Sequence, residues 1–164
     1  MRLLEITGPQ RNIGMTVAVQ KPITWINRTT SPGKNLLLFD GHCPFCTRQA
    51  QNLLALVPEG SIEIKSFQEP GLLDQFPGIT HEACMRAMHL IRADGRVFRG
   101  FEAAVQALAV RPVLGRIAAL YYMPGVRQLC DAVYSLIAAR RYRFWGKTAN
   151  ACPGGTCALH APKR

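Results

Sequence analysis

Two cysteines, Cys43 and Cys46, stand where a short apolar run gives way to an amphipathic segment. The run, residues 36–39, is continuous and apolar, which predicts a buried strand. Residues 43–57 place apolar side chains at helical spacing, and Pro44 falls in the first turn, where its missing N–H is not needed. The sequence therefore predicts a C-x-x-C pair at the junction of a strand and a helix, which restricts both the fold and the chemistry of this chain.

The segments that follow this helix predict the rest of a core. Residues 61–67 alternate Ile62 and Ile64 with charged side chains, which predicts a second strand, parallel to the first. The tripeptide Ala93-Asp94-Gly95 is typical of a hairpin turn. The remaining predicted elements are a connection with one short helix over residues 68–83, strands over 85–91 and 96–99, and a helix over 101–110.

This order of elements is that of the thioredoxin core, which carries its chemistry at the first strand-to-helix turn. We therefore predict an α/β, thioredoxin-like βαβ–ββα core with two extra C-terminal helices. The extra helices are expected over residues 112–123 and from 124 to about 142, with an apolar face that packs against the sheet. The predicted divisions are a loosely structured basic leader (1–35), a thioredoxin-like domain with its helical extension (36–145) and a flexible, Cys-containing tail (146–164).

The amino-terminal residues contain no apolar region long enough for a secretory signal. This predicts a reducing compartment, the cytoplasm, with an organellar matrix as the alternative. In such compartments paired cysteines are more often redox-active or metal-binding than structural. We favour a redox role, which needs no cofactor beyond a reversible Cys43–Cys46 disulfide.

Thiol–disulfide exchange needs a thiolate that attacks and a second thiol that releases the mixed disulfide. At a helix N-terminus, backbone N–H groups and the helix dipole stabilise the anion of the first cysteine. We therefore expect Cys43 to be the nucleophile and Cys46 the resolving thiol. Pro44 and Phe45 lie between them and offer an apolar contact for a protein substrate.

Two polar residues beside the pair are further candidates for catalytic roles. His42 adjoins Cys43 and, when protonated, would favour its thiolate; the alternative is an exposed loop histidine without a role. Asp40 ends the first strand and could carry a proton to or from Cys46. Its alternative role is to hydrogen-bond the backbone of the turn.

Three stretches of the chain resemble the DCC family of thioredoxin-like thiol–disulfide oxidoreductases. Residues 39–46 match its D-G-x-C-P-x-C signature, and residues 88–100 form a strand, a turn and a strand that reach a glycine before the next helix. Residues 133–143 fit the pattern Y-x-x-I-A-x-x-R-Y, which is frequent in the family. The resemblance covers residues 36–145 and implies a thioredoxin-like fold, with Cys43 and Cys46 as the redox pair and Asp40 as part of the signature.

The chain departs from ordinary thioredoxins just before the predicted third strand. Thioredoxins carry a cis-proline there, whereas this chain reads Ala83-Cys84-Met85-Arg86. This departure leaves open how the backbone of a substrate would dock. We expect Cys84 to be a buried structural thiol, and Cys130 to belong to the core through the apolar stripe of the last helix.

A second cysteine pair lies in the tail, where Cys152 and Cys157 are followed by His160. One interpretation is a second thiol pair that relays electrons to Cys43 and Cys46. A zinc site completed by His160 is another, and the third is that these cysteines have no role.

The net charge of +10 is confined to the two ends of the chain. Residues 1–35 carry a net charge of +4 and residues 111–164 of +8, whereas residues 36–110 carry −2. Basic flanks of this kind allow a second hypothesis, a non-catalytic module that docks on an anionic membrane surface or a larger complex. Arg140, Arg141 and Arg143 are its candidate contacts. No nucleic-acid-binding motif is present.

Overall fold

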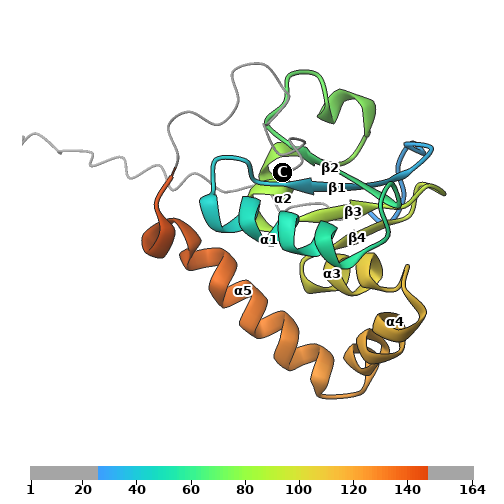
Figure 1. The fold of residues 1–164 in the computed structure, drawn as a ribbon. Helices are drawn as coiled ribbons and strands as arrows, with labels where there is room; N and C mark the ends of the chain where they lie inside the picture. The colour runs from blue at the N-terminus through green and yellow to red at the C-terminus, as the bar shows by residue number, and fades with distance from the viewer. Residues whose placement is uncertain (1–25, 148–164) are drawn as a thin grey trace, which may run out of the picture.

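The computed structural model describes residues 26–147, which form one mixed sheet with helices on both faces (Figure 1). The strands are β1 (Asn35–Phe39), β2 (Ile62–Ser66), β3 (His89–Ile91) and β4 (Val97–Arg99). Their order in the sheet is β2-β1-β3-β4, with β1 parallel to β2 and antiparallel to β3. The central position of β1 brings the loop that follows it to the middle of one sheet end.

Helices connect and extend this sheet. They are α1 (Pro44–Leu56), α2 (His81–Arg86), α3 (Phe101–Leu108), α4 (Pro112–Ala118) and α5 (Val126–Trp145), with short 3-10 helices η1 (Leu73–Gln75) and η2 (Ala119–Tyr122). α1 is the crossover between the parallel strands β1 and β2, as their direction requires. These elements confirm the predicted thioredoxin-like α/β fold.

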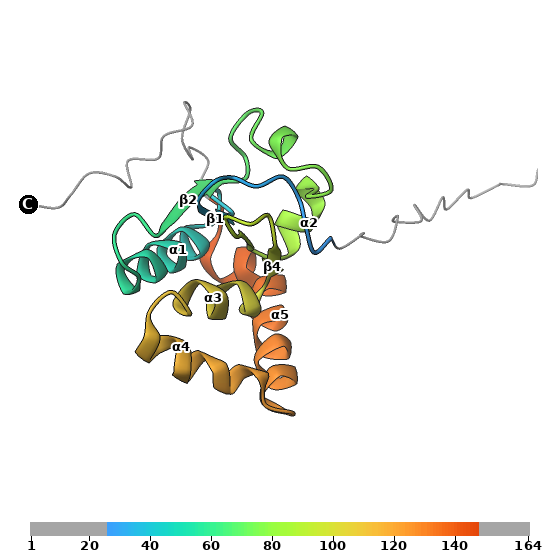
Figure 2. The ribbon, with the colours of Figure 1, turned by 90° about the vertical axis from the view of Figure 1, so that its right-hand side faces the viewer.

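Alternate side chains of β1 fill the cores on the two faces of the sheet. Leu37 and Phe39 pack with residues of α1 and α3, whereas Leu36 and Leu38 pack with residues of the connection between β2 and β3. Figure 2 shows α1 and α3 on one side of the sheet and α2 on the other. Because both faces are covered, residues 36–39 of the strand are all apolar instead of alternating with polar residues.

The third strand is shorter than its sequence predicts. Met85 and Arg86 belong to α2, and β3 begins at His89. Thr80 accounts for this difference, because its Oγ1 accepts a hydrogen bond from the N–H of Ala83 and so caps α2. The expected strand over residues 85–91 was therefore wrong at its start.

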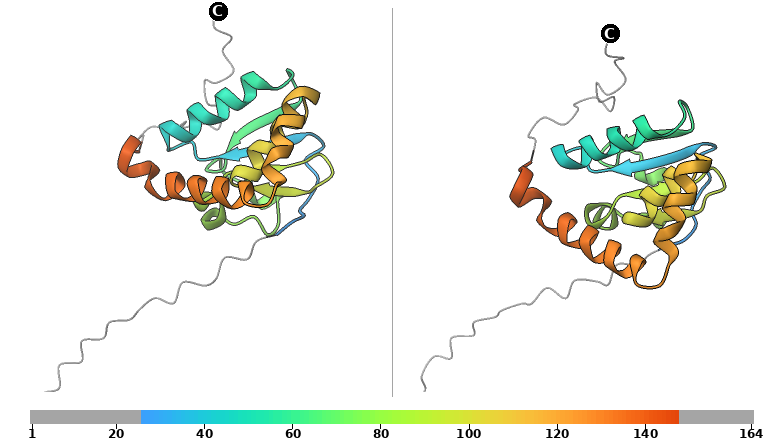
Figure 3. Two further views of the ribbon diagram at one scale, coloured as in Figure 1. Left: turned by 90° about the horizontal axis from the view of Figure 1, so that it is seen from below. Right: turned by 60° about the horizontal axis from the view of Figure 1, so that its bottom comes forward.

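The long helix α5 returns from α4 to the N-terminal end of α1 (Figure 3). The apolar stripe that was expected to pack against the sheet is exposed: Leu129 is 66% exposed and Val133 is 48% exposed. The neighbouring face, with Tyr134 and Arg141, is the one that contacts the core. The stripe thus lines an open groove beside α1 and α3 and does not pack on the sheet as expected, and polar contacts of Tyr134 and Arg141 attach α5 to the core. No helix among the described residues is both long and apolar enough to cross a membrane.

Part of the predicted leader pairs with the β3–β4 hairpin. The N–H of Thr29 donates to the carbonyl of Gly95 at 2.9 Å, and the N–H of Val97 donates to the carbonyl of Asn27 at 2.9 Å. Residues 27–31 thus lie along the core and are not a loose segment. Residues 1–25 and 148–164, which hold most of the predicted leader and tail, lie outside the described residues.

Candidate functional site

Cys43 is the N-cap of α1, and Cys46 lies in its first turn. The backbone of Cys43 is extended, its carbonyl accepts the N–H of Thr47, and Pro44 occupies the first helical position. The N–H of Cys46 donates to the Sγ of Cys43 at 3.3 Å. A sulfur that accepts a backbone N–H at a helix N-terminus is in a setting that favours its anion.

The two thiols are free and differ in exposure. Cys43 has no exposed surface, whereas Cys46 is partly exposed. Burial raises the pKa of Cys46 above its ordinary range, and a hydrogen bond with Cys43 and the charge of Cys43 raise it further. The surroundings of Cys46 therefore favour its protonated form.

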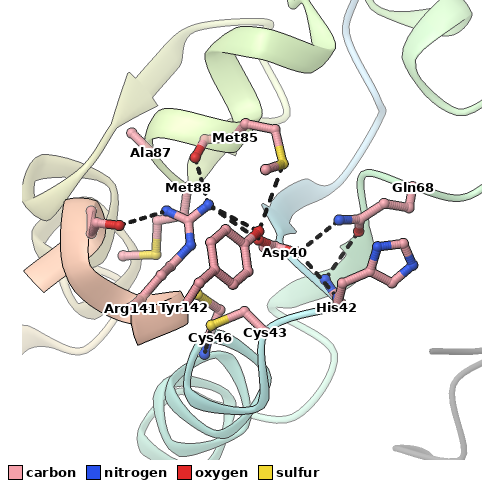
Figure 4. Close-up of polar contacts among 12 residues, drawn as sticks. Asp40, His42, Cys43, Cys46, Gln68, Met85, Ala87, Met88, Arg141 and Tyr142 are labelled. Carbon is pink, nitrogen blue, oxygen red and sulfur yellow. Dashed lines mark hydrogen bonds and ion pairs between the residues drawn. The ribbon is translucent and has the colours of Figure 1, made fainter. Parts of the chain in front are cut away.

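Asp40, directly after β1, is the centre of a buried polar network (Figure 4). It is 4% exposed. Its Oδ1 accepts the N–H of His42 at 3.0 Å and the Nε2 of Gln68 at 2.7 Å. Its Oδ2 accepts the Nη2 of Arg141 at 3.1 Å and the hydroxyl of Tyr142. Four donors, one of which is the buried cation Arg141, compensate for the removal of this carboxylate from water.

Arg141 is an ion-pair partner of the site and not a surface cation. The residue is 5% exposed, and its guanidinium also donates to the carbonyls of Met85 and Ala138. The expectation that Arg141 belongs to a docking face with Arg140 and Arg143 was therefore wrong for this residue, whereas its two neighbours are exposed. Arg141 is buried because it pairs with Asp40, which lies near the start of the domain sequence. Helical periodicity does not reveal such a contact between distant parts of the chain.

Tyr142 adds a hydroxyl to the same carboxylate. Burial raises the pKa of Tyr142 to about 12, and its hydrogen bond to Asp40 contributes to the increase. The ring lies 4.7 Å from the guanidinium of Arg141 and 4.7 Å from the Nζ of Lys147. Arg141 and Tyr142 are the final R-Y of the pattern found in residues 133–143, so that pattern marks contacts with the cysteine loop.

Gln68 and Gly41 fix the loop between Asp40 and Cys43. The Oε1 of Gln68 accepts the N–H of Gly41 at 3.0 Å while its amide group holds Asp40. A Cβ on Gly41 would lie 2.5 Å from the Oγ of Ser66, which leaves no room for a side chain. The glycine of the signature is therefore required by the close approach of β2. Sequence reasoning missed Gln68, since a single polar residue after a strand carries no signal of its own.

The other predicted site residues contribute in different ways. His42 is exposed, and Figure 4 shows its ring pointing away from the two sulfur atoms. Pro44 is exposed at the helix start. Phe45 stacks on Trp145, with ring centroids 4.2 Å apart and an interplanar angle of 21°. The last helix thus contacts Phe45, one of the two residues between the cysteines.

The backbone before β3 is fully used within the protein. The N–H of Met88 donates to the hydroxyl of Tyr134 at 3.0 Å, and its carbonyl accepts the N–H of Gly100 at 2.9 Å. No peptide bond of the described residues is cis. A substrate backbone therefore has no free partner at Met88, next to the place where thioredoxins carry their proline.

A mostly apolar groove of about 530 Å³ lies beside Cys46, between α1, α3 and α5. Phe45, Cys46 and Arg141 line one part of it, and Leu129 and Cys130 line another. Cys130 therefore lines a groove and is only partly buried, in contrast to the expected core position. Cys84 is buried as expected, and burial raises its pKa to about 12.

The proposed zinc ligands Cys152, Cys157 and His160 lie outside the described residues. Within residues 26–147, no group of three or more His, Cys, Asp or Glu side chains is arranged to hold a metal ion.

Comparison with known proteins agrees with this geometry. Residues 37–147 match the family model described as DCC1-like thiol-disulfide oxidoreductase. An uncharacterized chloroplastic protein from Arabidopsis thaliana is 30% identical over 131 residues, which cover 77% of this chain and 56% of the relative. The chain thus spans little more than half the length of that relative. No solved structure matches the chain significantly.

Proposed function

The chain belongs to the DCC1-like thiol-disulfide oxidoreductase family, and we propose that it exchanges disulfides with a protein partner through Cys43 and Cys46. The observation that carries this proposal is the hydrogen bond from the N–H of Cys46 to the Sγ of Cys43 at the start of α1. It supports Cys43 as the thiolate, while the raised pKa of Cys46 supports a resolving thiol that is protonated at rest.

In the reducing direction, the thiolate of Cys43 attacks one sulfur of the partner disulfide. The partner S–S bond breaks, a mixed disulfide forms, and the released partner thiolate takes a proton from water. Cys46 then loses its proton and attacks the Sγ of Cys43. The second partner thiol leaves, and a Cys43–Cys46 disulfide remains. Two electrons have passed from the cysteine pair to the partner.

We assign Asp40 as the group that accepts the proton of Cys46. Both residues line the groove beside α1, and the carboxylate acts electrostatically on this thiol. A carboxylate so placed can accept the proton as Cys46 attacks. His42 enters the proposal through its backbone N–H, which holds Asp40 Oδ1.

The apolar groove beside Cys46 indicates what kind of partner segment the protein would bind. Phe45 and Cys46 line it, and most of its other lining residues are apolar, as for Leu53, Val133 and Ile137. We assign it to an apolar segment next to the partner cysteine, with the exposed Pro44 beside Phe45 as a further contact. A reducing compartment would drive the cycle toward reduction of the partner.

A redox titration of the purified protein with thiol mapping tests this proposal. In glutathione buffers of graded potential, Cys43 and Cys46 should convert together and reversibly between dithiol and disulfide. Cys43→Ser should abolish turnover of a disulfide substrate, and Cys46→Ser should accumulate the mixed disulfide, because the resolving step is missing. Unchanged turnover in Cys43→Ser would rule the proposal out.

A second function, docking on an anionic membrane surface, is favoured by one observation on α4 and η2. Val113, Ile117 and Leu120 are 67%, 60% and 56% exposed at spacings of four and three residues, which places them on one helical face. Arg111 and Arg116 are exposed in the same segment. An exposed apolar face with neighbouring cations is typical of interfacial helices.

Cosedimentation with vesicles tests this second function. The protein should sediment with phosphatidylglycerol vesicles and not with phosphatidylcholine vesicles. Ile117→Gln and the pair Arg111→Gln/Arg116→Gln should each reduce binding, whereas Leu56→Gln, exposed on α1, should not. Equal recovery in the supernatant with both vesicles would exclude this function.

A further inference from the structure

We propose that Arg141 stabilises the thiolate of Cys46 during disulfide exchange, through a hydrogen bond from its Nε. This inference rests on the proposed exchange through Cys43 and Cys46 and assigns to it a residue outside the cysteine motif. It starts from a donor of the buried network that has no acceptor.

The guanidinium of Arg141 is almost fully buried, and its donors are unequally used. Its Nη atoms bond to Asp40 and to the carbonyls of Met85 and Ala138. The Nε is buried too, yet it has no hydrogen-bond partner among the described residues. A buried donor without an acceptor costs free energy, so such groups are rare in folded proteins. If an acceptor forms next to the Nε during the reaction, this cost disappears in the step in which that acceptor is present.

The Sγ of Cys46 is the reacting atom best placed to become that acceptor. Cys46 and Arg141 line the same groove, and the helices that carry them, α1 and α5, are in contact. Figure 4 shows the side chains of Arg141 and Tyr142 gathered beside the cysteine pair. Burial, Cys43 and Asp40 all raise the pKa of Cys46, whereas the charge of Arg141 lowers it. Of the described groups that act on this thiol, Arg141 is thus the one that favours its anion.

The shared guanidinium keeps the charge of the site balanced as the proton moves. Before resolution, the positive charge of Arg141 faces the Asp40 carboxylate. When Cys46 passes its proton to Asp40, the negative charge moves from the carboxylate to the sulfur. The guanidinium then faces the thiolate through its Nε, so a buried cation has a partner in both states.

The same contact serves both directions of exchange. Toward partner reduction, the Cys46 thiolate attacks Cys43 Sγ, the bond between Cys43 and the partner breaks, and the electron pair leaves on the partner sulfur. In reverse, a partner thiolate attacks Cys43, the Cys43–Cys46 bond breaks, and the electron pair stays on Cys46. Arg141 stabilises that leaving thiolate, since a better-stabilised leaving group departs faster.

An alternative explanation is that Arg141 acts on Cys46 indirectly, by neutralising the charge of Asp40. The experiment must separate this indirect effect from a direct hydrogen bond. In a Cys43→Ser background, the alkylation rate of Cys46 by iodoacetamide is measured against pH by peptide mapping. The comparison is between Asp40→Asn and Asp40→Asn/Arg141→Gln, since the carboxylate is absent from both proteins. Arg140→Gln, an exposed neighbour on α5, is the matched control.

The proposal predicts that Asp40→Asn/Arg141→Gln reacts about tenfold more slowly at pH 8 than Asp40→Asn, with its alkylation profile shifted about one pH unit upward. Arg140→Gln should leave the profile in place. Identical profiles with and without Arg141 would overturn the inference. If the glutamine variant does not fold, Asp40→Asn/Arg141→Met replaces the ion pair by an apolar chain and gives the same comparison. A failure of the proposed function is a different result: the natural protein would form no reversible Cys43–Cys46 disulfide.

Discussion

Phe45, between the two cysteines, stacks on Trp145 at the end of α5, with ring centroids 4.2 Å apart. The most C-terminal turn of the last helix is thereby attached to the segment that carries the cysteine pair. Because Cys43 has no exposed surface, a thiol reagent reaches its sulfur only when this region opens. The stack involves one of the two residues between the cysteines, so it is a contact that must yield or move if this region opens.

Replacement of Trp145 should make Cys43 more reactive. Trp145→Ala removes an aromatic pair that contributes about 0.5–1.5 kcal/mol, so we expect iodoacetamide to alkylate Cys43 several-fold faster. Peptide mapping at a fixed pH measures this rate. Leu136→Ala, an exposed site on the same helix, is the control and should leave the rate unchanged. An unchanged rate in Trp145→Ala would mean that the stack does not limit access.

Loss of Arg141 should destabilise the whole domain. Arg141→Ala leaves the buried carboxylate of Asp40 without its cation, which costs about 3–5 kcal/mol. Urea denaturation measures this loss. Arg140→Ala, at an exposed position, should change the free energy of unfolding by less than about 0.5 kcal/mol. Equal losses in the two variants would show that the Asp40–Arg141 pair does not stabilise the fold.

Gly41→Ala should distort the cysteine loop. The new Cβ would lie 2.5 Å from Ser66 Oγ and 3.0 Å from Ser66 Cβ, so β2 or the loop must move. We expect a loss of about 1–3 kcal/mol in the free energy of unfolding. Ser66→Ala removes the closer atom, so the double variant should lose less than the sum of the two single variants. Strict additivity in a double-mutant cycle would contradict this steric account.

The predictable parts of this protein are those encoded locally. An apolar run followed by Cys43 and Pro44 identifies the strand, the helix and the reactive junction, because each depends on neighbours in sequence. The roles of Gln68 and Arg141 depend on contacts with Asp40 across the fold, which no periodicity encodes. The resemblance in residues 133–143 was the available signal for Arg141, but a pattern of residue types does not say that its arginine is buried.

The face of α5 illustrates the same limit. Its apolar residues, Leu129 and Val133 among them, suggested a core-facing stripe, yet they are exposed. Tyr134 attaches the helix to the core through its hydroxyl, which accepts the N–H of Met88. The stripe faces a groove between α5 and the helices α1 and α3. Its periodicity therefore indicated the side of α5 that faces the domain, but not that this side stays open while buried polar contacts attach the helix.

His89 gives the domain a defined pH dependence. The residue lies in β3 and is 3% exposed. Burial is the main cause that lowers its pKa to about 4, and the charge of Arg99 also lowers it. A hydrogen bond with the carbonyl of Ala87 raises the pKa but does not offset these two effects. An unfolded chain binds the proton near pH 6.5. Between pH 6.5 and 4 the unfolded state therefore holds a proton that the folded state lacks, so stability falls as the pH falls.

We expect this effect to reach about 3 kcal/mol across that window, from about 1.4 kcal/mol for each unit of pKa difference. Urea denaturation at pH 7.5, 6.0 and 5.0 measures it. His89→Gln should be less stable at pH 7.5 and should show a shallower decline toward pH 5, because its side chain does not titrate. His42→Gln changes an exposed histidine and should retain the slope of the natural protein. A slope in His89→Gln as steep as that of the natural protein would assign the pH dependence to other groups.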